Sequence, residues 1–146
     1  HQVGNGTFGH PIGLDARLEA EIAANYNSYI RTGDLSGIAA TAYLQFVPFE
    51  RGTSSTALLD PTSTQGPDAT ANVMCLTCHR AHASAFMYAG RWDFTAELLA
   101  NSHPAIGDSG ATATDVSNST YGRNLSIEFG SNQGSFCQKC HPQGTP

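Results

Sequence analysis

The 146-residue chain is predicted to fold as one mainly α-helical domain, residues 1–146, with long irregular loops. Apolar residues recur at steps of four from Leu14 to Ile30, which is the spacing of one face of an amphipathic helix. Two other segments, 51–72 and 104–120, are rich in small and polar residues and are predicted to be surface loops. A chain of this length leaves room for one domain and hardly for two.

The other elements are predicted along the chain in order. The helix from Leu14 to Ile30 is closed by Gly33, a common residue at a helix end. The apolar stretch Ile38–Val47 fits a second helix, and a strand fits nearly as well. We expect further helices from Cys75 to about Gly90 and from Trp92 to Ala100.

The composition excludes two classes of protein. Charged residues make up 13% of the chain, the net charge is −5, and Lys139 is the only lysine. Nucleic-acid binding through the phosphate backbone needs clustered basic residues, so it is not expected. No apolar run approaches the 18 or more residues of a membrane span. The chain begins at His1 and is rich in Ser, Thr, Asn and Gly, so we expect an exported protein without its signal peptide.

All four cysteines occur in two C-x-x-C-H pentapeptides. The first is Cys75-Leu76-Thr77-Cys78-His79 and the second is Cys137-Gln138-Lys139-Cys140-His141. This pattern is the attachment signature of c-type haem: both thiols form thioethers with the haem, and the histidine ligates iron from one side. The sequence therefore predicts two haem c groups, with His79 and His141 as proximal ligands. Because long loops are uncommon without another organiser, we expect the two covalent haems to replace much of the apolar core.

Three other uses of the cysteines are weaker predictions. Four thiolates can bind one zinc ion, but that leaves both histidines unexplained. A thioredoxin-like C-x-x-C pair usually lies beside a βαβ pattern, which this sequence lacks. Two disulfides across such short spacings would be strained and would close almost no loop.

Each iron needs a distal ligand on its other side, and His82 is a candidate for one of them. It follows His79 by three residues and is expected on the same helical turn. A solvent-exposed or hydrogen-bonding histidine is the alternative. On that turn His82 would lie on the proximal side of its own haem, so any iron that it ligates would belong to the haem held by Cys137 and Cys140. The two haems would in that case be close together.

The first haem would take its distal ligand from His10, with His103 as the alternative. Each of these histidines precedes a proline, which favours an extended backbone from which an imidazole can be presented to a haem face. His1 is expected to be free or to serve a neighbouring subunit. Met74 and Met87 are minor alternatives as ligands.

The first pentapeptide and its surroundings, Met74 to Ser84, resemble small multihaem c-type cytochromes exported by metal-reducing bacteria of the Geobacter kind. Shorter similarities are found at Gly9-His10-Pro11 and from Phe136 to His141. The resemblance implies that His82 ligates a neighbouring haem and that His10 is a distal ligand. It also implies electron transfer in the periplasm, at the outer surface or outside the cell. Some members of the group polymerise into filaments with a continuous haem stack.

We therefore expect an electron carrier with two bis-His, low-spin haems and no enzymatic activity. Its partners would be redox proteins or extracellular electron acceptors, and copies of the chain would assemble into a filament if haem edges lie at both ends. The alternative is a dihaem enzyme, a peroxidase or a reductase, with one open iron position. A gas or redox sensor with an exchangeable ligand is a third class.

Overall fold

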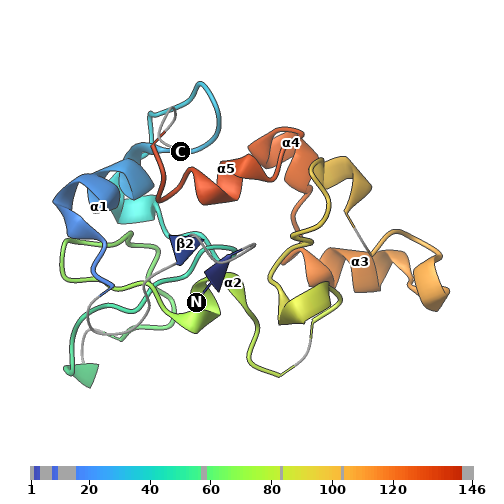
Figure 1. Ribbon diagram of the computed structural model, residues 1–146, viewed down its shortest axis with the longest axis horizontal. Helices are drawn as coiled ribbons and strands as arrows, with labels where there is room; N and C mark the ends of the chain where they lie inside the picture. Colours follow the sequence, from blue (N-terminus) through green and yellow to red (C-terminus); the bar gives the residue numbers. More distant parts are fainter. Residues whose placement is uncertain are drawn as a thin grey trace.

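The structure is a computed structural model that describes residues 2–3, 8–9, 16–56, 59–82, 84–102 and 104–142. Figure 1 shows short helices joined by long irregular segments, which confirms the predicted mainly α-helical fold with long loops. The α-helices are α1 (Glu19–Ser28), α2 (Cys75–Cys78), α3 (Ala113–Ser119), α4 (Leu125–Phe129) and α5 (Gly134–Cys137). Single turns of 3₁₀ helix are η1 (Ala39–Thr41), η3 (Met87–Ala89), η4 (Leu99–Asn101) and η5 (Asp108–Gly110).

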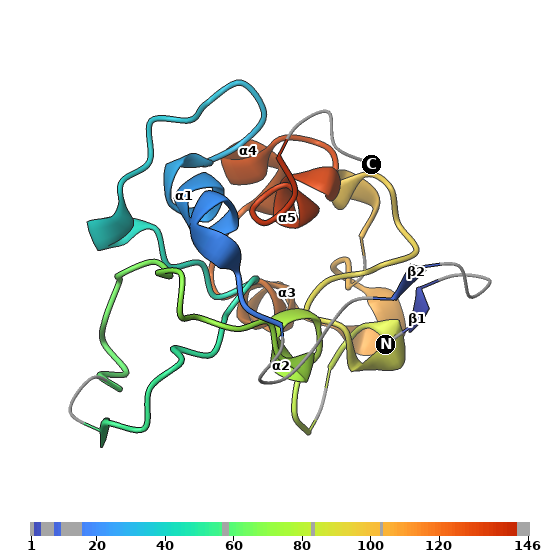
Figure 2. The ribbon, with the colours of Figure 1, turned by 60° about the vertical axis from the view of Figure 1, so that its left-hand side comes forward.

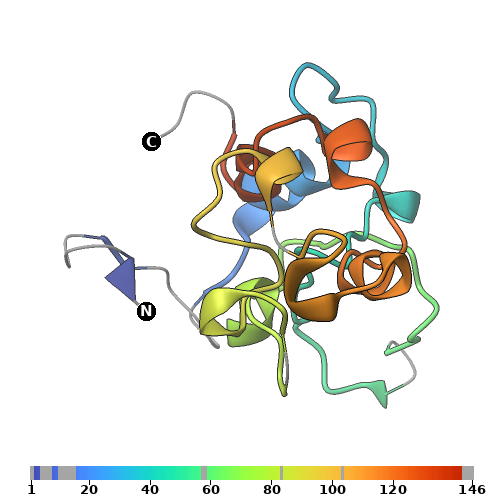
Figure 3. The ribbon, with the colours of Figure 1, turned by 90° about the vertical axis from the view of Figure 1, so that its right-hand side faces the viewer.

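The strands form one small antiparallel hairpin. Strand β1 (Gln2–Val3) pairs with β2 (Phe8–Gly9), with Gln2 opposite Gly9 and Val3 opposite Phe8. Figure 3 shows this hairpin lying apart from the helices. Within the described ranges, no helix combines the length and the apolarity that a bilayer crossing needs.

Helix α1 confirms the first predicted helix but is shorter, because the backbone before it pairs with another segment. Leu18 N–H donates to Ala71 O (2.9 Å) and Val73 N–H donates to Ala16 O (2.9 Å). Arg17 also pairs with Asn72 in an isolated bridge. Because residues 16–18 are bonded to the segment 71–73 in this way, the helix begins only at Glu19. It ends at Ser28, ahead of the predicted Gly33.

The predicted helices over 75–90 and 92–100 are wrong. Helix α2 ends at Cys78, and the chain then folds back so that His79 pairs with Gly90 in an isolated bridge. Further along, the Asp93 carboxylate accepts hydrogen bonds from the amide (2.9 Å) and the hydroxyl (2.6 Å) of Thr95, which stabilises a turn. Over 38–47 only the 3₁₀ turn η1 forms.

The described residues of the segment 51–72, which are 51–56 and 59–72, are irregular as predicted, but the predicted loop 104–120 contains α3. This helix starts with a capping box: the Asp115 carboxylate accepts from Thr112 N–H (2.8 Å), and Thr112 Oγ1 accepts from Asp115 N–H (3.3 Å). Helix α4 was not predicted. Asn124 caps its N-terminus, since its side-chain oxygen accepts from Ile127 N–H (3.2 Å), and the helix is followed by Gly130, with φ of 83°.

The core is a cluster of aromatic and aliphatic side chains between α1, α4, α5 and the segment 42–49. Phe46 is fully buried and its ring lies 5.0 Å from that of Phe136, nearly parallel to it. Tyr26 is also fully buried: its hydroxyl donates to Val47 O (2.7 Å) and accepts from Leu44 N–H (3.1 Å). Figure 2 shows α1 beside α4 and α5, so the core connects the first half of the chain to the second pentapeptide.

Replacing Tyr26 with Phe tests how helix α1 is joined to the segment 42–49. The change leaves two buried backbone groups unpaired, so we expect the free energy of unfolding to fall by about 1–3 kcal/mol. Urea unfolding followed by far-ultraviolet circular dichroism measures it. The control is Tyr43→Phe, at a half-buried tyrosine whose ring packs on Phe49, with an expected change under about 0.5 kcal/mol. Equal stabilities of the two variants would contradict this role of the Tyr26 hydroxyl.

Candidate haem-binding site

The two pentapeptides adopt the same backbone turn. In the first, the first cysteine opens α2, and His79 N–H donates to Cys75 O (3.0 Å). In the second, the first cysteine closes α5, and His141 N–H donates to Cys137 O (2.9 Å). In both, the first cysteine is exposed and the second is half-buried. One helical turn therefore brings two thiols and an imidazole together, as attachment to one porphyrin requires.

The thiols of the two pentapeptides lie near one another. Cys78 and Cys140 both pack against the same hydrophobic core. Burial, and after it the neighbouring Cys78, raises the pKa of the Cys140 thiol to about 12. Burial also raises the pKa of the Cys78 thiol, with a second contribution from Cys137. The two pentapeptides therefore converge in space although about 60 residues separate them in the sequence.

The imidazole of His79 is oriented by the turn that follows it. Its Nδ1 lies 2.8 Å from the carbonyl oxygen of Tyr88, so a proton on Nδ1 is donated there and Nε2 is left for iron. Tyr88 and Ala89 have φ of 59° and 52°, a left-handed conformation that is uncommon outside glycine. Backbone strain of this kind persists where the surrounding structure fixes it, here next to the proximal ligand.

Arg80, Arg91 and Tyr121 connect the first pentapeptide to other segments of the chain. Arg91 donates from Nε to Leu76 O and from a terminal nitrogen to the hydroxyl of Tyr121 (2.8 Å). The Arg80 guanidinium stacks on the ring of Tyr121 at 4.9 Å, and it donates to Ser119 O. The first pentapeptide is thereby tied to the region after α3. Thr77 adds a local contact, since its hydroxyl accepts from Met74 N–H (3.0 Å).

The second pentapeptide is held by helix α1 through Lys139, which occupies the position of Thr77. Lys139 Nζ donates to the carbonyls of Tyr26 (3.0 Å) and Tyr29 (2.7 Å), and it lies 4.6 Å from the centre of the Tyr26 ring. A cation at the C-terminus of a helix is stabilised by the helix dipole. In the other direction, Asn25 donates to the carbonyls of Gln138 (2.8 Å) and Lys139 (2.9 Å). The single lysine of the chain is thus 5% exposed and serves as a helix cap.

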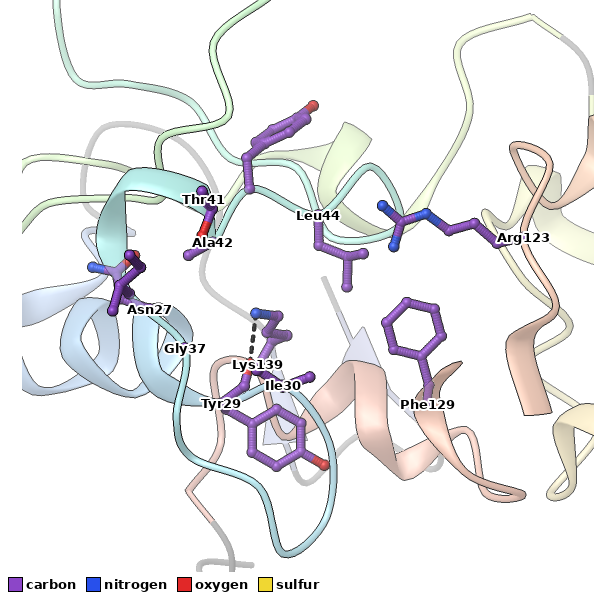
Figure 4. A pocket seen from close by; sticks show the side chains of 12 residues that line it. Asn27, Tyr29, Ile30, Gly37, Thr41, Ala42, Leu44, Arg123, Phe129 and Lys139 are labelled. Carbon is purple, nitrogen blue, oxygen red and sulfur yellow. Dashed lines mark hydrogen bonds between the residues drawn. The ribbon is translucent and has the colours of Figure 1, made fainter. Parts of the chain in front are cut away.

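A cavity of about 220 Å³ lies beside this junction. Figure 4 shows Lys139 and Tyr29 at its wall, with Arg123 and Phe129 on the opposite side. It is smaller than the roughly 300–1,000 Å³ of typical small-molecule sites. Both cations at its wall already have partners: the ammonium of Lys139 donates to two carbonyls, and Arg123 pairs with Glu128.

The residues around the first pentapeptide fit a haem. Leu76, Met87 and Tyr88 are 38%, 62% and 70% exposed, and a porphyrin placed there would cover apolar surface of this kind. Arg80 Nε is buried and unpaired among the described residues, and a haem propionate accepts hydrogen bonds from guanidinium groups. When bound, the group supplies an iron that takes up and releases one electron. Cys75, Cys78 and His79 would hold one haem, and Cys137, Cys140 and His141 the other.

The alternatives to haem have less support. All four cysteines are described and all are free thiols. No three His, Cys, Asp or Glu side chains in the described ranges are grouped as metal ligands would be.

Only one of the predicted distal ligands lies in the described part of the chain. His82 is exposed, and the premise that it shares a helical turn with His79 is wrong because α2 ends at Cys78. His1, His10 and His103 lie outside the described residues. The roles of Lys139, Arg80 and Arg91 were not predicted from the sequence. Only the role of Lys139 had a signal there, because the single lysine of the chain lies inside the second pentapeptide.

Comparison with known proteins gives one curated relative. No family model matches the chain. This chain is 39% identical over 149 residues to the C-type cytochrome OmcS of Geobacter sulfurreducens. The alignment covers 90% of this chain and 34% of the relative. The chain therefore spans about a third of that protein.

Two solved structures are similar as well. One is the Outer Membrane Cytochrome S filament from Geobacter sulfurreducens, with a TM-score of 0.72 and 35% identity. The other is the cryo-EM structure of the OmcS nanowires from the same organism, with a TM-score of 0.74 and 36% identity. Each similarity covers 97% of this chain and 39% of the other. The predicted resemblance to cytochromes of Geobacter is confirmed, and the fold is similar to that of the c-type cytochrome OmcS.

Replacing Lys139 with Met tests how the second pentapeptide is anchored. The carbonyls of Tyr26 and Tyr29 lose their donor, so we expect the free energy of unfolding to fall by about 1–3 kcal/mol. Urea unfolding measures the change. Arg31→Met, at an exposed cation, is the control and should change stability by less than about 0.5 kcal/mol. An unchanged stability of the Lys139 variant would contradict the anchoring role.

Proposed function

We propose that residues 1–146 form one dihaem unit that transfers electrons through two closely spaced, bis-His, low-spin c-type haems. The observation that carries the proposal is the convergence of the two pentapeptides on one core, with their thiols close enough to influence one another. Groups attached at these thiols would be near neighbours. Electron exchange between them then needs no large movement of the chain.

The ligand set of the proposal combines both halves of the chain. His79 and His141 are the proximal ligands, and His82 is the distal ligand of the haem on Cys137 and Cys140. The exposure of His82 supports its availability to a haem other than its own. His10 is the distal ligand of the first haem, with His103 as the alternative. Ligation of both irons by histidine on both sides leaves no open position for a substrate, so the protein is not an enzyme.

The proposal extends to location and assembly. The relative's solved form is a filament, and the similarity to it supports an exported unit at the outer surface or outside the cell. Copies of the chain would polymerise with haems stacked across subunits, and His1 would serve a neighbouring subunit if it ligates iron. The electron partners are redox proteins or extracellular acceptors. The competing function is a dihaem enzyme, a peroxidase or a reductase, with one open iron.

Visible spectra with and without carbon monoxide separate these two functions. We expect two low-spin c-type haems per chain whose reduced spectra do not change with carbon monoxide, because every axial position is occupied by histidine. A high-spin fraction that binds carbon monoxide would favour the enzyme. Electron micrographs of the native protein test assembly, and only monodisperse particles would count against the filament.

Haem attachment is tested by removing one pair of thiols at a time. The double variant Cys75→Ser, Cys78→Ser should lose one covalent haem and keep the other, because each pentapeptide binds its own porphyrin. The matched variant Cys137→Ser, Cys140→Ser should do the same. The pyridine haemochrome assay and the intact mass give the haem number per chain. Unchanged haem content in either variant would contradict the assignment.

The distal ligands are tested by single alanine substitutions. His82→Ala should turn the second haem high-spin, and His10→Ala should do so for the first, because each iron loses one axial ligand. His103→Ala is the matched control and should leave both haems low-spin. The visible and electron paramagnetic resonance spectra report the spin state. A spectrum of His82→Ala identical to that of the parent protein would refute the cross-ligation.

A further inference from the structure

A continuous row of aromatic rings joins the two pentapeptides. The His79 ring lies 5.8 Å from the ring of Phe94, edge to face at 87°. Phe94 lies 5.2 Å from Trp92, and Trp92 lies 4.9 Å from Phe136. Phe136 immediately precedes Cys137. These four residues, the aromatic row, lead from the proximal ligand of one haem to the attachment site of the other.

Each ring of the row is also fixed by contacts outside it. Trp92 is 4% exposed, and its Nε1 donates to the side-chain oxygen of Gln133 (3.1 Å). The Gln133 amide donates in turn to Phe94 O (3.4 Å), and Gln133 is the N-terminal flanking residue of α5. Phe136 is 1% exposed and stacks on Phe46. The rings therefore have little freedom to rotate, and the row behaves as a rigid connection.

Gly90 allows the row to close on His79. It pairs with His79 in the isolated bridge and has an ordinary extended backbone, with φ of −61°. A Cβ at this position would lie 2.6 Å from Trp92 O and 3.0 Å from the nearest atom of the Phe94 ring. The backbone conformation at residue 90 suits any residue, but a side chain there would displace the segment 92–94 from its contact with His79.

We propose that Phe94 and Trp92 are positioning residues that fix the plane of the His79 imidazole and the mutual orientation of the two haems. The contact of Nδ1 with Tyr88 O restrains the His79 ring in one direction, and the edge-to-face contact with Phe94 restrains its rotation. Through Trp92 and Phe136 the same row sets where Cys137 lies relative to His79. The inference rests on the proposed function, because it concerns haems attached at these residues.

Two spectroscopic signals depend on these orientations. In a bis-His haem, the angle between the two imidazole planes sets the g values of the ferric low-spin signal. In a pair of close haems, the mutual orientation sets the shape of the coupled circular dichroism in the Soret region. A residue that only stabilises the fold changes neither signal in the correctly folded fraction.

The experiment compares three variants of the whole haem-loaded protein: Phe94→Leu, Gly90→Ala and the control Phe49→Leu. Phe49 is 7% exposed in the same core, but it contacts Tyr26 and Tyr43 and lies outside the row. We expect Phe94→Leu and Gly90→Ala to shift or broaden one low-spin signal and to change the Soret couplet. Gly90→Ala keeps every aromatic ring, so this variant alone tests the proposal if Phe94→Leu does not fold. Phe49→Leu should lower stability and leave both signals as in the parent protein.

The outcomes separate this inference from the proposed function. Haem content and spin state of the parent protein are measured first, and a parent without two low-spin c-type haems overturns both proposals. With both haems present, unchanged signals in Phe94→Leu and Gly90→Ala overturn the positioning role alone. Equal changes in Phe49→Leu also overturn it, since the effect would then follow from core packing in general.

Discussion

Each pentapeptide must leave two thiols and an imidazole open on one side while the chain holds it firmly from the other. Regular secondary structure is too short here to meet this constraint, because the longest helix, among those described, has 10 residues. Long-range bonds from side chains to backbone carbonyls take its place. Arg91 binds the carbonyl of Leu76, and Asn25 binds those of Gln138 and Lys139. These bonds satisfy carbonyls that a longer helix or a sheet would otherwise have paired.

Several of the few cations of the chain bond to carbonyls and aromatic rings within the fold rather than to surface carboxylates. In the part of the chain that the structure describes, the ion pair found is Arg123 with Glu128. Four cations also lie over aromatic rings: Arg51 over Phe49, Arg80 over Tyr121, Arg123 over Phe129 and Lys139 over Tyr26. Burying an ammonium costs free energy, which is visible in the pKa of Lys139, lowered by burial to about 8. The two carbonyls and the ring offset that cost.

The pentapeptides, the loop over 51–72 and the first helix could be predicted because each depends on residues close in sequence. The absence of helices over 75–90 and 92–100 could not be predicted, because backbone pairing with other segments overrides local helix propensity. His79 pairs with Gly90 and Leu98 pairs with Asn132 in isolated bridges. Helix α3 was missed although its signal was present. Thr112 and Asp115 have the spacing of a capping box, but the small polar residues around them favoured a loop.

The two pentapeptides share one backbone turn, yet they are anchored in different ways. Thr77 bonds to Met74, three residues away, whereas Lys139 occupies the same position and bonds to carbonyls 110 and 113 residues away. The first turn is therefore stabilised by its own sequence together with the arginines, and the second depends on α1 being in place. Contacts between distant segments are lost together when either segment opens. The amphipathic first helix thus acts as the support of the second haem-binding turn, which explains why the only lysine of the chain lies between Cys137 and Cys140.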